Sequence, residues 1–179
     1  GNTEVPGICL LDVGSSIGYT TIEYAKRCRM KPAGEWTGSV STINGTKMST
    51  YPIFMAKIKD ARGHYHSAKL LGTRRIGLKK KLPDELFKKL CQDFHLSQSS
   101  LQNSDGEINI LLGLDSAALL SDKHLDMSNP NYPQLFVCSS PLSSQFFFCG
   151  SIGKDLLGDD IVRTLTFKQD LVCFHTALT

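Results

Sequence analysis

Several patterns that identify common classes of protein are missing from this sequence. Its 179 residues contain no P-loop, no glycine-rich dinucleotide fingerprint and no zinc-ligand spacing. No stretch approaches the roughly 20 apolar residues of a membrane-spanning helix, and no signal peptide is visible. The net charge of +3 is too small to indicate nucleic-acid binding by itself. We therefore expect no cofactor, no metal, no membrane partner and no nucleic-acid partner.

Cysteine is present, but not in the paired spacing of a disulfide or metal framework. Several of the six cysteines lie within apolar runs, and they are Cys9, Cys28, Cys91, Cys138, Cys149 and Cys173. Buried free thiols are typical of proteins in reducing compartments. We expect an intracellular protein, cytoplasmic or nuclear, with a disulfide framework as the alternative.

The pattern of apolar residues predicts a mostly β protein with two short helices. With 41% hydrophobic and 21% charged residues, the chain can form one domain, or one domain with an elaborated tail. Helical spacing covers Thr21–Cys28, which Pro32 follows, and a second helix opens at Leu82-Pro83-Asp84-Glu85. After a turn-rich linker, four short runs predict strands: Leu135–Cys138, Gln145–Cys149, Arg163–Lys168 and Leu171–His175.

Three segments are expected at the surface: a hairpin, a pair of histidines and a basic segment. Trp36–Ile43 alternates loosely and leads into Asn44-Gly45, a strong hairpin signal. His64-x-His66 places two imidazoles on one strand face, but no third metal ligand is nearby, and an exposed hairpin explains the pair. The basic segment Arg74–Lys81 can contact phosphates, but it lacks interleaved aromatic residues and favours a solvated loop.

Two stretches about 100 residues apart share one design. The apolar run Ile8–Leu11 ends at Asp12, and Val13-Gly14-Ser15-Ser16 then forms a turn. The later stretch, Ile108–Asp115, is another apolar run that closes on Gly and Asp. A carboxylate at the end of a core strand is costly to bury unless it is hydrogen-bonded, neutralised or used. Asp12 is therefore the first candidate for a functional side chain.

In this order, the two stretches resemble the retropepsin-like aspartic peptidases. More narrowly, the chain resembles the peptidase domain of BEL/Pao-type LTR retrotransposon polyproteins. Four segments, covering about two-thirds of the chain, carry this resemblance: Leu10-Leu11-Asp12-x-Gly14-Ser15, the helix-like Thr20–Cys28, Asn109–Asp115 and Phe136–Gly150.

The resemblance implies a fold and a division of the chain. The expected fold is mostly β with two short helices, a retropepsin-like closed β-barrel half in residues 1–125. A C-terminal β-rich extension, residues 126–179, is expected to pack on the same domain. The segment before Asp12 is short for this family, so part of the dimer sheet is either missing or supplied by the tail.

The resemblance also implies a site. Asp12 would be catalytic, with Val13, Gly14 and Ser15 as its loop and Gly113 and Asp115 as a supporting loop. A flap over the substrate would comprise Ile43, Asn44, Gly45 and Thr46, and the alternative for this segment is an ordinary surface hairpin. The chain supplies one Asp-x-Gly-Ser loop, so a homodimer would contribute two copies of Asp12, and the substrate would be an extended peptide or polyprotein segment.

Position 13 departs from the family, which has Thr or Ser there. Val13 lacks the hydroxyl that would fix the two catalytic loops across the dimer axis. The alternative function is therefore a catalytically inactive domain that serves dimerisation or protein interaction. A third interpretation, a serine-hydrolase elbow at Gly14-x-Ser16-x-Gly18, lacks the preceding strands that such an elbow needs.

Overall fold

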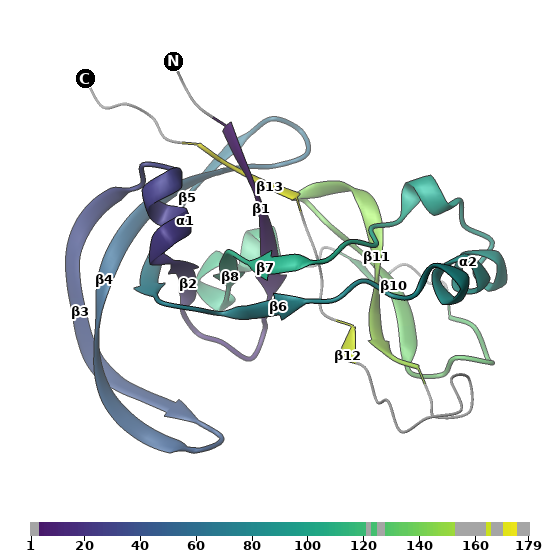
Figure 1. Ribbon diagram of the computed structural model, residues 1–179, viewed down its shortest axis with the longest axis horizontal. Coiled ribbons are helices and arrows are strands. Elements are labelled where there is room, and N and C mark those ends of the chain that lie inside the picture. The colour runs from purple at the N-terminus through teal and green to yellow at the C-terminus, as the bar shows by residue number, and fades with distance from the viewer. Residues whose placement is uncertain (1–3, 121–122, 125–127, 153–163, 166–169, 175–179) are drawn as a thin grey trace.

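The computed structural model describes residues 4–120, 123–124, 128–152, 164–165 and 170–174, and these are mostly β-strand (Figure 1). The strands of the first half are β1 (Glu4–Leu11), β2 (Gly18–Thr21), β3 (Lys31–Thr42), β4 (Gly45–Lys59) and β5 (Tyr65–Thr73). Those that follow are β6 (Gly77–Lys79), β7 (Gly106–Ile108), β8 (Ile110–Leu112), β9 (Lys123–His124), β10 (Leu135–Ser140), β11 (Ser143–Ser151), β12 (Thr164–Leu165) and β13 (Asp170–Phe174). The described helices are α1 (Ile22–Arg27), α2 (Asp84–Asp93) and the 3-10 turns η1 (Gln98–Ser100) and η2 (Leu114–Leu119).

The larger sheet has seven strands in the order β13-β1-β8-β2-β5-β4-β3. The β1–β8 and β2–β5 pairs are parallel, and β13 pairs antiparallel with both β1 and β4. Of the apolar residues predicted for the first core strand, Ile8, Cys9 and Leu11 are buried and Leu10 is half-buried. Asn109 connects three strands, because its side chain accepts a hydrogen bond from Ile8 N at 2.8 Å and its carbonyl accepts one from Thr21 N at 2.9 Å.

Helix α1 confirms the first predicted helix. Thr21 is its N-cap and accepts a hydrogen bond from Tyr24 N through the hydroxyl, at 3.3 Å. The buried Tyr24 side chain donates to Val5 O at 2.9 Å, which fastens the helix to β1. The helix ends at Arg27, and Pro32 lies in β3.

Helix α2 confirms the second predicted helix and packs on a second sheet, whose order is β12-β11-β10-β9 (Figure 1). Pro83 is at its N-cap, and Asp84 and Glu85 occupy the first turn, where negative charge suits the helix dipole. The apolar face of α2 is buried in a cluster with residues of β10 and β11: Leu86, Phe87, Leu90, Cys91, Phe94, Leu135, Val137 and Phe148. The division predicted at residue 125 stays a prediction, although residues from both sides of it share this cluster.

The C-terminal strands are described in part. The runs predicted at Leu135–Cys138 and Gln145–Cys149 lie within β10 and β11. Residues 164–165 and 170–174 form β12 and β13, whereas residues 163, 166–168 and 175 of the other two predicted runs lie outside the described residues.

A buried carboxylate holds the turn between β4 and β5. Asp60 accepts hydrogen bonds from Arg62 N at 2.9 Å and His64 N at 2.8 Å, and its other oxygen lies 2.9 Å from His66 Nε2. These interactions, led by that with His66, hold the pKa of the Asp60 carboxyl well below its usual range. The His64/His66 pair thus serves this turn, and the described residues include no metal-binding cluster.

We expect Asp60→Asn to lower the melting temperature at neutral pH. A carboxyl whose pKa is lower in the folded state contributes stability above its unfolded pKa of about 3.9 and loses it as the pH falls through the folded value. The difference in melting temperature between wild type and variant should therefore shrink as the pH falls below about 4. Asp84→Asn is the control, because the Asp84 side chain is 84% exposed. An Asp60→Asn effect that is independent of pH would contradict this interpretation.

Candidate functional site

The candidate site begins where β1 ends. Asp12 N continues the pairing with β8 by donating to Leu112 O at 2.9 Å, and the chain then turns sharply. Gly14 N donates to Asp12 Oδ1 at 2.8 Å, which orients the carboxylate. Ser15 Oγ donates to Ile17 O at 2.7 Å, so this hydroxyl serves the loop's own backbone. We call residues 12–17 the Asp12 loop.

The segment after β8 lies against this loop, as the resemblance implies. Leu114 N donates to Ser15 O at 2.8 Å, and Gly18 N donates to Asp115 Oδ2 at 3.1 Å. A side chain at Gly113 would not fit, because a Cβ there would lie 2.5 Å from Ser15 O. The structure therefore places Gly113 and Asp115 where a supporting loop is expected, and explains why the first is glycine.

The predicted hairpin forms between β3 and β4. Thr42 pairs with Gly45, so the turn residues are Ile43 and Asn44, and Gly45 has a φ of 116°, which favours glycine. Asn44 N donates to the Thr42 hydroxyl at 3.3 Å. Ile43 lines the neighbouring cleft, whereas the other three predicted flap residues, Asn44, Gly45 and Thr46, do not. The residues just before the turn, Ser39 to Thr42, line it instead.

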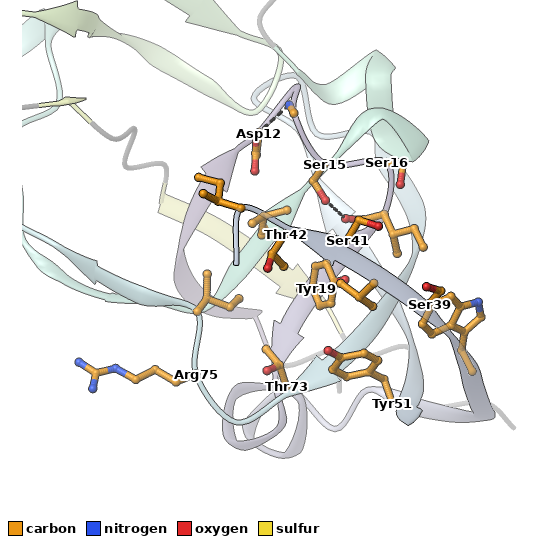
Figure 2. Close-up of a pocket in the computed structure, with 17 residues that line it drawn as sticks. Asp12, Ser15, Ser16, Tyr19, Ser39, Ser41, Thr42, Tyr51, Thr73 and Arg75 are labelled. Carbon is orange, nitrogen blue, oxygen red and sulfur yellow. Dashed lines mark hydrogen bonds between the residues drawn. The ribbon is translucent and has the colours of Figure 1, made fainter. Parts of the chain in front are cut away.

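A cleft of about 1060 Å³ lies between the Asp12 loop and this hairpin. Asp12, Gly14 and Ser15 line it, but the fourth loop residue of the prediction, Val13, does not and is 70% exposed. Figure 2 shows Asp12 and Ser15 on one wall and Ser41 and Thr42 of the hairpin beside them. The structure thus brings the predicted loop and the predicted hairpin to one cavity.

Aromatic side chains line the cleft farther from the Asp12 loop. Tyr51 stacks on Trp36 with ring centroids 6.2 Å apart and meets the ring of Tyr19 edge-on at 5.8 Å. Burial, with a smaller effect of Tyr51, raises the pKa of the Tyr19 hydroxyl. Sequence reasoning did not select these residues as part of a site. A signal was present, because Trp36 and Tyr51 are cross-strand partners in the hairpin that Asn44-Gly45 indicates, and such partners lie on one face of the sheet.

Asp12 is the one carboxylate among the described residues that line the cleft. An aspartic-peptidase dyad would need two carboxylates that share one proton, and one copy of the described cleft supplies one. Ser16, the residue of the elbow interpretation, lines the cleft, and among the described residues no histidine lines it.

Comparison with known proteins gave no match: no family model, no curated protein and no solved structure matches this chain. Among the described residues, no helix is long and apolar enough to cross a membrane.

We expect Gly113→Ala to displace the Asp12 loop. Its methyl group would lie 2.5 Å from Ser15 O and 2.9 Å from Ile17 O, so the backbone must shift. The free energy of unfolding should fall by about 1–3 kcal/mol, as for other overpacked sites, and amide hydrogen exchange at Ser15 and Leu114 should accelerate.

Gly77→Ala is the matched control, because the nearest side-chain atom to its Cβ would be 3.7 Å away. Equal stability losses for the two variants in denaturant unfolding would show that the close approach at Gly113 is unimportant.

Proposed function

We propose that this chain is a retropepsin-like aspartic peptidase domain of retroelement origin. It would hydrolyse peptide bonds through two copies of Asp12 in a homodimer. The observation that carries the proposal is the placement of Asp12: its carboxylate is held by Gly14 N at 2.8 Å, in a cleft that also borders a long hairpin.

The proposed chemistry requires two carboxylates that share one proton. Like charges at short distance do not both ionise, so one carboxyl stays protonated while the other, as carboxylate, takes a proton from the attacking water. One chain supplies Asp12 alone to its cleft among the described residues, and a two-fold axis beside the Asp12 loop would supply the second.

Exposed apolar side chains near Asp12 support the homodimer. Val13 is 70% exposed, Leu114 is 53% exposed, and Ile43 at the hairpin tip is fully exposed. Val13 adjoins Asp12, and Leu114 is hydrogen-bonded to the same loop through Ser15. Large apolar side chains grouped at a functional site favour burial against another chain. A second copy that brings its own Asp12 would cover them.

Two features of the large sheet support the proposed fold and ligand. β13 pairs with both β1 and β4, an arrangement that favours the closed barrel half and a tail that contributes beside β1. β3 is the last strand in the sheet order, and its residues Ser39–Thr42 line the cleft. An extended peptide or polyprotein segment can add to such an edge by backbone hydrogen bonds.

Val13 favours a second candidate function, an inactive domain for dimerisation or protein interaction. Valine has nearly the shape of threonine, and two-fold symmetry removes donor and acceptor together, so stability suffers little. Positioning of the carboxylates suffers more, since an error of about 1 Å can reduce the rate on the order of 100-fold. We also propose an intracellular location, which the buried cysteines Cys9, Cys28, Cys91 and Cys138, without paired spacing in the sequence, favour.

The test compares wild type, Asp12→Asn and Val13→Thr for mass in solution and for cleavage of a broad peptide library at about pH 4–7. We expect dimers in all three cases, slow cleavage by wild type and none by Asp12→Asn. Val13→Thr should cleave faster, by up to about 100-fold, because the hydroxyl would fix both loops.

The other outcomes separate the two functions. Cleavage by Val13→Thr alone would identify an enzyme inactivated at that position. Dimers that are inert in all three forms would establish the interaction module. Monomers throughout would rule out the shared dyad.

A further inference from the structure

Two charged side chains line the cleft among the described residues, and they have opposite signs. One is Asp12, and the other is Arg75, which follows the end of β5 at Thr73. Figure 2 shows Arg75 at the edge of the group of lining residues, apart from Asp12, with its guanidinium pointing away from Asp12 and from the other labelled residues. The proposed chemistry uses Asp12 and leaves Arg75 without a role.

Arg75 has no carboxylate partner in the part of the chain that the structure describes. The ion pairs there use other cations: Lys59, His64, His66, Lys81 and Lys89. The Arg75 side chain is exposed at the cleft, and a guanidinium is positively charged at every working pH. Its planar donors match a carboxylate in geometry as well as in charge.

The rest of the basic segment does not accompany Arg75 into the cleft. Arg74, Lys80 and Lys81 are exposed but do not line the cavity, and Lys79 is buried. The walls near Arg75 are apolar or hydroxyl-bearing, with Ile76 and Thr73 beside it. One cation among such groups suits one acidic side chain of a peptide better than a row of phosphates.

We propose that Arg75 makes this cleft selective for peptides with an acidic side chain at a distance from the scissile bond. This inference rests on the proposed function, because it takes the bond to be cut at Asp12. A two-fold axis through the dyad would duplicate Arg75 at the other end of the cleft. Peptides with acidic residues on both sides of the bond are then the best substrates, followed by those with one.

The experiment uses quenched fluorescent peptides from a position-scanning library in which each position in turn is Glu, Gln or Lys. The proteins are wild type, Arg75→Ala, Arg75→Glu and Arg74→Ala, the last as the matched control. We expect wild type to prefer Glu over Gln by about fivefold in kcat/KM per favoured position, as for an exposed ion pair. The preference should weaken with added salt.

The variants assign the preference to one residue. Arg75→Ala should remove it, Arg75→Glu should transfer it to Lys, and Arg74→Ala should retain it. Equal losses in Arg74→Ala and Arg75→Ala would indicate a general effect of charge and overturn the proposal, as would a wild type without preference. Tight binding of a single-stranded RNA oligomer that both alanine variants weaken equally would also overturn it.

A binding assay separates this inference from the proposed function. The same peptides are titrated into Asp12→Asn protein, with and without Arg75→Ala, and followed by fluorescence anisotropy. If the peptides bind selectively but wild type does not cleave them, the role of Arg75 is retained and the peptidase function is ruled out. If wild type cleaves peptides without any preference for acidic residues, the peptidase function is retained and the role of Arg75 is ruled out. Neither binding nor cleavage of any peptide would overturn both.

Discussion

The candidate site depends on one close contact, that between the Asp12 loop and the segment Gly113–Asp115. Two backbone amides, Leu114 N and Gly18 N, find their acceptors across this contact, and no room remains at Gly113 for a side chain. Because Asp12 itself is bonded to Leu112, the carboxylate is positioned by segments 100 residues apart. A carboxylate fixed in this way favours binding or catalysis, because its position is set before any ligand binds.

The contact was predicted through the resemblance to the retropepsin-like peptidases, which rests on two local patterns: an apolar run that ends at Asp12 and a later one that closes on Gly113 and Asp115. The two helices were predictable for a similar reason, from Thr21 as an N-cap and from the apolar spacing of α2. Where α2 packs was not predictable, because an amphipathic face does not specify its partner. The aromatic residues of the cleft and Arg75 were not predicted as site residues. Several elements contribute one or two of these residues each, and only the fold brings them together.

Threonine at position 13 would keep the shape of the loop and also supply a hydroxyl across the proposed dimer axis, whereas Val13 does only the first. A β-branched side chain of the same size keeps the shape of the loop, and in the proposed dimer two-fold symmetry removes donor and acceptor together, so no buried polar group is left unpaired. Catalysis depends on position more steeply than stability does, so one substitution can leave a dimer intact and reduce the rate. In the proposed peptidase, activity and assembly could therefore diverge.

The pairing of β1 with β13 has a consequence for how the chain is made. Glu4 aligns with Phe174, so β1 waits for a partner strand that is synthesised more than 160 residues later. β4 waits for the same strand. Such long-range pairing slows folding, and until it is complete both strands present free edges to other chains. Chaperones, or other nascent chains on the same messenger RNA, would contact the chain at the free edges of β1 and β4.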